Sequence, residues 1–317
     1  MAVITTGFFD GVHLGHRHVL ETVVSSARER GEEAIVVTFW PHPRTVLQQD
    51  AREFRLLSSL EEKKEHLLAS GIDRVEVLPF TREFAAMKAE EYLRFLRTRY
   101  GATLVVMGYD NRIGSDKKTA SEISGESSPS APQEIIFCDG AQKTDFPLRL
   151  SFATQRTDSP SAVAISSTII RAALAEGDVS SANGMLGYRY GLYGVVVAGN
   201  RLGRTIGFPT ANMQLYEPLK LVPCNGVYSV EVDVLGRQYK GMCNIGLRPT
   251  VDGKVRTIET HILDFNEDIY GLPLRLRFLH RIRDERKFPS LEALKEQLQK
   301  DKLLCNLKIN SYLCSDI

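Results

Sequence analysis

The chain is poor in cysteine, and the few cysteines it has are scattered. Five occur among 317 residues, their number is odd, and none is spaced as Cys-x-x-Cys. This distribution disfavours both a disulfide framework and a zinc site. We therefore interpret the cysteines as reduced, mostly structural thiols of a cytoplasmic protein.

An excess of positive charge is also lacking. The 40 lysines and arginines are balanced by 39 aspartates and glutamates, which leaves a formal net charge of +1. Such a balance excludes a polyelectrolyte surface for nucleic acid, although it allows a local basic pocket for phosphate groups. We expect small phosphorylated ligands and no nucleic-acid partner.

Long apolar runs are the third absence. No stretch approaches the roughly 20 apolar residues that cross a membrane, and the N-terminal residues lack the charged-then-apolar order of a secretory leader. We expect a cytoplasmic protein without a membrane partner. The sequence leaves the oligomeric state open, a homo-oligomer included.

Residues 1–182 alternate strand and helix patterns. The expected strands are Ala2–Thr6, Ala34–Phe39, Val75–Leu78 and Leu104–Met107. Helical spacing lies between them, with one helix stopping at Gly31, one beginning with a capping box at Ser59, and one stopping at Gly101. This order predicts an α/β Rossmann-like domain, whose ligands bind outside the carboxyl ends of its parallel strands.

Residues 183–317 follow a different pattern, with short alternating runs separated by Gly, Pro and Asn. The expected strands are Tyr193–Val197, Gly226–Leu235, Gln238–Asn244, Thr257–Leu263 and Leu274–Arg281. A last helix carries Leu291, Leu294 and Leu298 on one face. We predict an antiparallel β-barrel domain with a C-terminal helix. Before it, the pattern weakens over 115–159, and the Ser-, Glu- and Pro-rich Ser121–Pro132 predicts an exposed, mobile flap.

A glycine-rich turn with two histidines, Gly7–His16, directly follows the first strand. Backbone N–H groups at the start of a helix bind phosphate, and the imidazoles of His13 and His16 are suited to stabilising charge on a transferring phosphorus. The segment predicts nucleotidyl transfer, and a structural turn with two surface histidines is the alternative. Because Pro41–Pro43 and Gly108–Asp110 also follow strands, we expect them to converge on this turn.

A second glycine-rich segment, Arg204–Asn212, lies in the barrel domain. Glycines let the backbone approach phosphate groups closely, and the Thr210 hydroxyl and the Asn212 amide oxygen are hard ligands suited to Mg²⁺. The alternative interpretation is a turn-rich barrel loop, in which Thr and Asn are common.

Both segments resemble motifs of one family. Gly7–His16 resembles the signature of the nucleotidyltransferase module of bacterial bifunctional riboflavin kinase/FMN adenylyltransferases, and Arg204–Asn212 resembles the G-R-x-x-G-F-P-T-A-N element of riboflavin kinases. Further matches follow in order, including Asn244–Thr250 and Arg283–Phe288, so the resemblance covers almost the whole chain. It implies an FMN adenylyltransferase domain over 1–182 and a riboflavin kinase domain over 183–317.

The resemblance also implies roles for individual residues. In the adenylyltransferase domain, ATP and its phosphates would be held by Gly7, Phe8, Phe9, Asp10, Gly11, Ser167, Thr168 and Arg171. The flavin would contact Asp110 and Asn111. In the kinase domain, ATP and flavin would be held by Gly203, Arg204, Gly207, Pro209, Thr210 and Asn212. Glu259 would be the base for the ribityl hydroxyl, with Thr210 and Asn212 holding Mg²⁺.

Two of these assignments have a purely structural alternative. Ser167–Arg171 also fits an ordinary helix start, with a serine N-cap and a solvated arginine. Glu259 also fits a solvent-facing strand residue paired with an arginine. In addition, Asn111 and Ile113 replace the two phenylalanines usual in this family's G-x-[DN]-F-x-F-G segment, which predicts weaker flavin stacking or altered local packing.

The predicted enzyme phosphorylates riboflavin to FMN with Mg-ATP and then transfers AMP from a second ATP onto FMN, which yields FAD and pyrophosphate. Three other functions share part of this sequence pattern. A class I aminoacyl-tRNA synthetase shares H-x-G-H, but this chain is short and offers no basic surface for RNA. A nucleotidyltransferase fused to a non-catalytic flavin-binding barrel is the second. The third is a flavin-binding regulator, or a riboflavin kinase with an impaired adenylyltransferase module.

Overall fold

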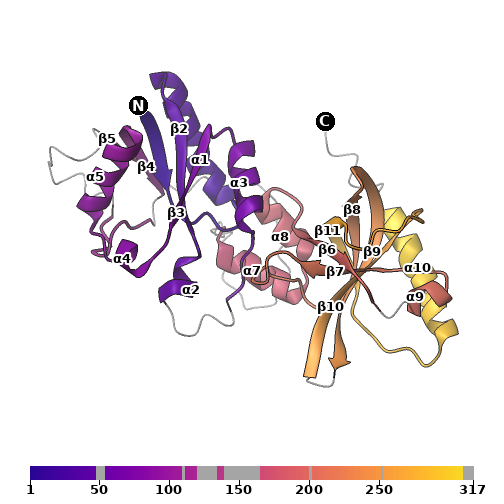
Figure 1. Cartoon of the computed structure of the whole chain (residues 1–317). Coiled ribbons are helices and arrows are strands. Elements are labelled where there is room, and N and C mark those ends of the chain that lie inside the picture. The colour runs from indigo at the N-terminus through magenta and orange to yellow at the C-terminus, as the bar shows by residue number, and fades with distance from the viewer. Residues whose placement is uncertain are drawn as a thin grey trace, which may run out of the picture. The chain divides into compact units, whose positions relative to one another are not determined.

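The computed structural model describes residues 1–47, 54–108, 111–119, 134–138, 165–199, 202–250 and 253–309. These residues form two compact units, Met1–Ser167 and Thr168–Ile317 (Figure 1).

The first unit is built on a five-stranded parallel sheet with strand order β3-β2-β1-β4-β5. Its strands are β1 (Ala2–Thr6), β2 (Glu33–Trp40), β3 (Arg74–Pro79), β4 (Ala102–Gly108) and β5 (Glu134–Cys138). Every residue of β1 is buried, because a central parallel strand is covered on both faces. The predicted α/β fold is confirmed.

Helices cover both faces of this sheet (Figure 1). They are α1 (Leu14–Arg30), α2 (Pro43–Leu47), α3 (Leu60–Ala69), α4 (Arg82–Ala85) and α5 (Ala89–Tyr100). The apolar stripe of α1, which includes Leu20 and Val23, packs on one face, and the stripe of α5, which includes Leu93 and Leu96, packs on the other. The two stripes make two core layers, and the strands between them end at a common edge.

The helix ends expected from local chemistry are confirmed. Gly31 ends α1 and Gly101 ends α5, both in the left-handed conformation with φ of 66° and 67°. Ser59 and Glu62 form a capping box, in which the Ser59 Oγ accepts from the Glu62 N–H and a Glu62 carboxylate oxygen accepts from the Ser59 N–H. These signals lie within a few residues of each other, so the sequence displays them directly.

Strand β5 corrects the prediction for residues 115–159. Its backbone pairs in parallel with β4, from Leu104 opposite Glu134 to Gly108 opposite Cys138. A short apolar run without alternation is not diagnostic of a strand, so the sequence pattern did not predict β5. The predicted flap Ser121–Pro132 lies outside the described residues.

The second unit is a closed barrel with strand order β10-β7-β6-β11-β8-β9, paired antiparallel throughout. Its strands are β6 (Gly191–Val197), β7 (Ala211–Leu215), β8 (Gly226–Val234), β9 (Arg237–Thr250), β10 (Gly253–Ile262) and β11 (Pro273–Arg283). The predicted antiparallel barrel is confirmed. Strand β7 was missed, because Pro and Asn in the second glycine-rich segment suggested a loop.

Four helices accompany the barrel: α7 (Ser167–Glu176), α8 (Val179–Leu186), α9 (Leu202–Thr205) and α10 (Leu291–Ile309). Helix α8 packs on β11, where the Asn183 Nδ2 donates to the Phe278 carbonyl at 2.9 Å. The Asn183 Oδ1 in turn accepts from the Tyr190 N–H at 2.7 Å. The boundary predicted between residues 182 and 183 therefore falls inside α8.

We expect a fragment of residues 168–317 to fold on its own. A fragment that starts at Asn183 lacks Val179 and Ala182, both fully buried. Their loss is expected to cost about 2 to 4 kcal/mol of unfolding free energy. Urea denaturation of both fragments measures the difference. Equal midpoints would show that α8 contributes nothing to the stability of the barrel.

Candidate active sites

The turn that follows β1 is held in an unusual backbone conformation. Phe9 and Val12 have φ of 53° and 38°, and Gly11 between them has φ of 81°. Left-handed φ values cost non-glycine residues roughly 1 to 3 kcal/mol each and persist where the surroundings enforce them. Phe9 and Val12 are buried in the core layer under α1, which supplies that enforcement. The turn is therefore fixed before any ligand arrives.

His13 and His16 lie against each other at the start of α1. His13 is the N-cap residue, and its Nδ1 accepts from the His16 N–H at 3.3 Å. The two rings stack with centroids 3.7 Å apart, and the His16 ring meets the Phe9 ring edge-on at 5.2 Å. Burial, then the neighbouring His13 and the Lys63 ammonium, hold the pKa of His16 well below its usual range. The lowered pKa favours the uncharged ring at neutral pH, and the buried His16 Nδ1 has no hydrogen-bond partner in the described part of the structure.

Asp10 ties the turn to the segment before α3. Its buried carboxylate accepts from the N–H groups of Leu57 and Ser58 at 3.0 to 3.1 Å, and the Gly11 N–H donates to the Ser58 Oγ at 3.1 Å. The Ser167 Oγ donates to the Asp10 carbonyl at 2.9 Å. The structure thus brings Ser167 to the turn, and it gives the Asp10 carboxylate backbone partners. A contact between Asp10 and phosphate stays a prediction.

The expected convergence of strand ends is confirmed for His42. Its ring centroid lies 4.0 Å from that of Phe8 and 4.2 Å from that of Phe54. Asn111 lies at the same edge of the sheet, because its Nδ2 donates to the Thr6 carbonyl at the end of β1, at 3.4 Å. Asp110 lies outside the described residues.

Ile113, one of the two departures from the family's usual pattern, is a core residue. It is buried in the layer under α5, where Phe84 also packs. The side chain at this position therefore contributes to core packing, and an effect on flavin stacking stays a prediction. Thr168 and Arg171 of α7 fall in the second compact unit, and their roles as ATP ligands stay predictions.

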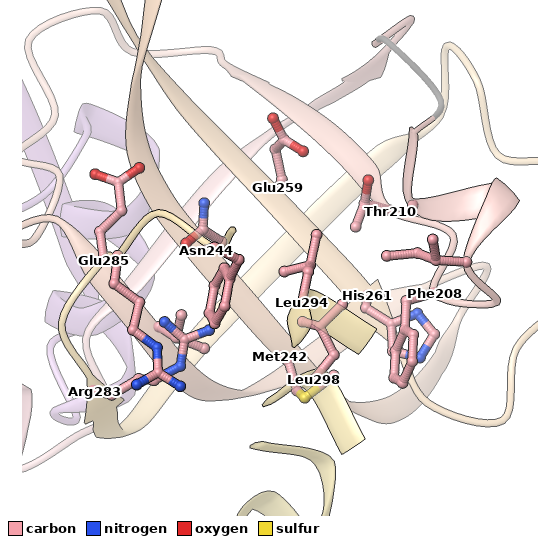
Figure 2. Close-up of a pocket in the computed structure, with 15 residues that line it drawn as sticks. Phe208, Thr210, Met242, Asn244, Glu259, His261, Arg283, Glu285, Leu294 and Leu298 are labelled. Carbon is pink, nitrogen blue, oxygen red and sulfur yellow. The ribbon is translucent and has the colours of Figure 1, made fainter. Parts of the chain in front are cut away.

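The barrel contains a cavity of about 290 Å³ between its strands and α10. Figure 2 shows Glu285, Asn244, Glu259 and Thr210 along one edge of it. Apolar side chains, among them Phe208, Met242, Leu294 and Leu298, line it together with His261 and Arg283. A pocket with a broad apolar surface and a few convergent polar groups suits a flat, largely apolar ring system that carries a polar chain.

Glu259 lies on β10 between two strands that each place an asparagine beside it. It is directly opposite Asn212 of β7 and directly opposite Asn244 of β9. Residues paired in this way point to the same face of a sheet. Thr210 immediately precedes β7 and lines the cavity with Glu259 and Asn244. The barrel therefore gathers a carboxylate, a hydroxyl and two amides from segments far apart in the chain.

Glu259 also has the arginine partner that its alternative interpretation anticipated. The Arg248 Nη2 lies 2.6 Å from the Glu259 Oε1. This pairing does not remove Glu259 from the pocket, since 24% of its side chain is still exposed.

Glycine is required at Gly203, immediately before the second glycine-rich segment. A Cβ atom there would lie 2.2 Å from the Phe208 carbonyl oxygen, which is a prohibitive contact. Beyond it, the Pro209 carbonyl accepts from the His261 Nδ1–H at 2.8 Å, so His261 supports the loop. Burial lowers the pKa of His261. Gly207 has φ of 83°, and Arg204 is exposed on α9.

Several residues of this pocket received no role from the sequence. Asn244 and Glu285 lie in segments that matched the family, yet nothing in those segments indicated which side chains face the pocket. Arg283 also lines the pocket, and its guanidinium binds the fully buried Asp301 of α10, with Nη2 to Oδ2 at 2.8 Å. This ion pair attaches α10 to strand β11 of the barrel, beside the cavity.

Asp301→Asn is expected to lower the unfolding free energy of the barrel by about 3 kcal/mol, because it leaves the Arg283 guanidinium without its buried counter-charge. Urea denaturation followed by barrel fluorescence or circular dichroism measures the change. Glu296→Gln, at an exposed position of the same helix, is the matched control and should shift stability by less than about 0.5 kcal/mol. Equal effects of the two substitutions would contradict the anchoring role.

The described residues contain no group of three or more His, Cys, Asp or Glu side chains that could hold a metal ion. No helix among them is long and apolar enough to cross a membrane. The expected Mg²⁺ ligands, Thr210 and Asn212, are neutral oxygen donors. They fit an ion that keeps most of its waters and binds chiefly to nucleotide phosphates.

Comparisons with known proteins cover both units. Residues 1–135 match the family model for FAD synthetase, and residues 186–307 match the model for riboflavin kinase. The bifunctional riboflavin kinase/FMN adenylyltransferase of Bacillus subtilis is 36% identical over 304 residues, covering 95% of this chain and 90% of the relative. The enzyme of the same description from Escherichia coli K12 is 35% identical over 303 residues, with 95% and 90% covered.

A solved structure also matches nearly the whole chain. The crystal structure of a macrolide-efflux protein from Streptococcus pneumoniae superposes with a TM-score of 0.83 at 32% identity, and the match covers 96% of this chain and 93% of that one.

Proposed function

This chain belongs to the bifunctional riboflavin kinase/FMN adenylyltransferase family, and from that membership we propose how its residues divide the two reactions. The protein phosphorylates riboflavin with ATP to give FMN, and it then transfers AMP from ATP to FMN to give FAD and pyrophosphate. We assign the first reaction to the barrel pocket and the second to the turn after β1.

For the kinase reaction, Glu259 is the base. It accepts the proton of the terminal ribityl hydroxyl as that oxygen bonds to the γ-phosphorus of ATP and the bond to the β,γ-bridging oxygen breaks, releasing ADP. The observation that carries this assignment is the grouping of Glu259 with Thr210 and Asn244 in one pocket.

Thr210 and Asn212 would hold Mg²⁺, which neutralises phosphate charge when bound. Gly203, Gly207 and Pro209 shape the loop that admits phosphates.

For adenylylation, a phosphate oxygen of FMN attacks the α-phosphorus of ATP in line, and pyrophosphate leaves. No covalent enzyme intermediate is needed, so catalysis consists of positioning and charge stabilisation. His13 and His16 stabilise charge on the phosphates, with His16 acting as an uncharged donor because its pKa is lowered. Backbone groups of Gly7 to Gly11, together with Ser167, Thr168 and Arg171, are proposed to hold ATP.

The working environment follows from the substrates. Riboflavin, FMN and ATP are small soluble molecules, and the free thiols of Cys224, Cys243 and Cys305 suit a reducing compartment. We place the protein in the cytoplasm on these grounds.

The direct experiment is product chromatography after incubation of the full chain with riboflavin, ATP and Mg²⁺. We expect FMN to appear first and FAD to accumulate after it, and we expect both products to vanish when EDTA removes the metal. FMN without FAD would contradict the assignment of the turn after β1. Product formation unchanged by EDTA would contradict the metal role of Thr210 and Asn212.

A further inference from the structure

Lys63 is a completely buried lysine beside the turn after β1. It lies on α3 and has no exposed surface, a rare condition for a lysine that is not paired. Its Nζ donates to the Phe8 carbonyl at 3.0 Å and to the Thr38 Oγ1 at 3.1 Å, with a longer contact of 3.5 Å to the Phe39 carbonyl. These acceptors are neutral oxygens, so the ammonium group does not sit in an ordinary ion pair.

The acceptors mark the edge of the sheet at which ligands bind. Phe8 belongs to the turn after β1, and Thr38 lies near the end of β2. The Phe8 carbonyl also accepts from the Thr38 Oγ1 at 3.1 Å. The Lys63 Nζ lies 3.6 Å from the centroid of the Phe8 ring, which is close enough for a cation–π contact. Lys63 thus contacts both the backbone carbonyl and the aromatic ring of Phe8.

The lysine is placed by a second set of contacts between α3 and the same turn. Asp10 accepts from the backbone immediately before α3, as described above, and the capping box between Ser59 and Glu62 fixes the first turn of that helix. Lys63 follows one residue after this box. The helix is therefore attached to the turn on two sides, through the Asp10 carboxylate and through the Lys63 ammonium.

Charge adds to this geometry. The titratable groups that act on or respond to the ammonium are Asp10 and His16, and His13 stacks on His16. Burial lowers the pKa of Lys63 to about 7, and Asp10 opposes that shift. The cationic form of Lys63 disfavours a second positive charge on His16.

We propose that Lys63 is a positioning residue of the adenylyltransferase site, which holds Phe8 and the following turn in register through the hydrogen bonds of its Nζ and its contact with the Phe8 ring. This inference rests on the assignment of FMN adenylylation to that turn. Because Lys63 is buried, it acts through Phe8 and His16 and not by touching the nucleotide. The sequence offered one signal, since Lys63 lies four residues before the buried Leu67 and so occupies the apolar stripe of α3.

The test is Lys63→Met, which keeps an unbranched side chain of similar length and removes the charge and the donors. We expect kcat for conversion of FMN to FAD to fall about 100-fold, because a displacement of roughly 1 Å at reacting groups costs about that much. Riboflavin phosphorylation, measured on the same preparation, should not change. Lys64→Met, at the neighbouring residue that contacts Glu61 at 3.5 Å, is the control and should leave both rates unchanged.

The pKa of His16 distinguishes a positioning role of Lys63 from a role in core packing alone. The His16 ring proton is followed by NMR through a pH titration of wild-type protein, Lys63→Met and Lys63→Gln. Loss of the cation should raise the pKa of His16 in both Lys63 variants, while Lys63→Gln should retain more adenylylation because its amide still donates to Phe8. If Lys63→Met fails to fold, Lys63→Gln carries the test alone, with an expected loss of about tenfold and the same upward shift.

Two results would overturn the proposal: adenylylation unchanged in a folded Lys63 variant, or a loss of adenylylation with the His16 titration unmoved. The second result would assign Lys63 to packing alone. His16→Ala distinguishes this failure from failure of the site assignment. If His16→Ala abolishes adenylylation and Lys63→Met does not, only the role of Lys63 is wrong. If neither has an effect, the assignment of the turn is wrong.

Discussion

Glu259→Gln is expected to lower riboflavin phosphorylation by about two to four orders of magnitude, the usual contribution of a positioned general base. Glutamine keeps the shape of the side chain and can still accept a hydrogen bond from Arg248, which lies 2.6 Å from Glu259. It loses the ability to take up the proton of the ribityl hydroxyl. Conversion of supplied FMN to FAD should persist, because that reaction is assigned to the other unit.

The measurement is a pair of initial rates on one preparation, with riboflavin or FMN as substrate. Glu267→Gln is the matched control, since Glu267 is an exposed carboxylate of the barrel that also pairs with an arginine, Arg237. It should leave both rates unchanged. If both rates fall together in Glu259→Gln, the residue is structural, and if neither falls, the proton leaves by another route.

His13→Ala and His16→Ala are each expected to lower FAD formation from FMN by about two to three orders of magnitude, which is the usual cost of one preorganised charge stabiliser. FMN formation should continue. The two rings stack at 3.7 Å, so each variant also disturbs its partner, and the double variant should lose less than the product of the single losses.

The control for this pair is His18→Ala, two residues further along α1 and only partly buried, which should retain full adenylylation. The pH dependence supplies an independent check. Because the pKa of His16 is lowered, its uncharged form persists below the usual histidine range, and its contribution is lost only as the pH falls through that lowered pKa. Full FAD synthesis in both single variants would remove these histidines from the mechanism.

Local signals in the sequence were enough for the first unit's main elements. The helix stops at Gly31 and Gly101 and the start at Ser59 depend on residues within one helical turn, and the structure has all three. Strands β5 and β7 were not predicted from the sequence, because each is stabilised by its neighbours in a sheet and has no alternating pattern of its own. Strand formation depends on pairing between distant segments, which adjacent residues do not display.

The sites divide in the same way. The sequence identified His13, His16 and Thr210 as residues of interest, because contiguous motifs display their chemistry. It indicated Glu259 only through the resemblance to the family. It could not indicate that Asp10 would bind backbone amides, since that depends on how the segment before α3 folds back onto the turn. For Lys63 the sequence showed only its place in the apolar stripe of α3, because its acceptors lie in the turn after β1 and on β2, far from it in the chain.

By itself, the sequence determined that this protein has an α/β unit followed by an antiparallel barrel and that it carries the motifs of a riboflavin kinase and an FMN adenylyltransferase. Periodicity, caps and motifs are properties of neighbouring residues. Only the tertiary structure decided that Asn212 and Asn244 flank Glu259, that Arg248 pairs with it, and that Asp301 fastens α10 over the pocket. These contacts depend on strand register and helix packing, which join segments far apart in the chain.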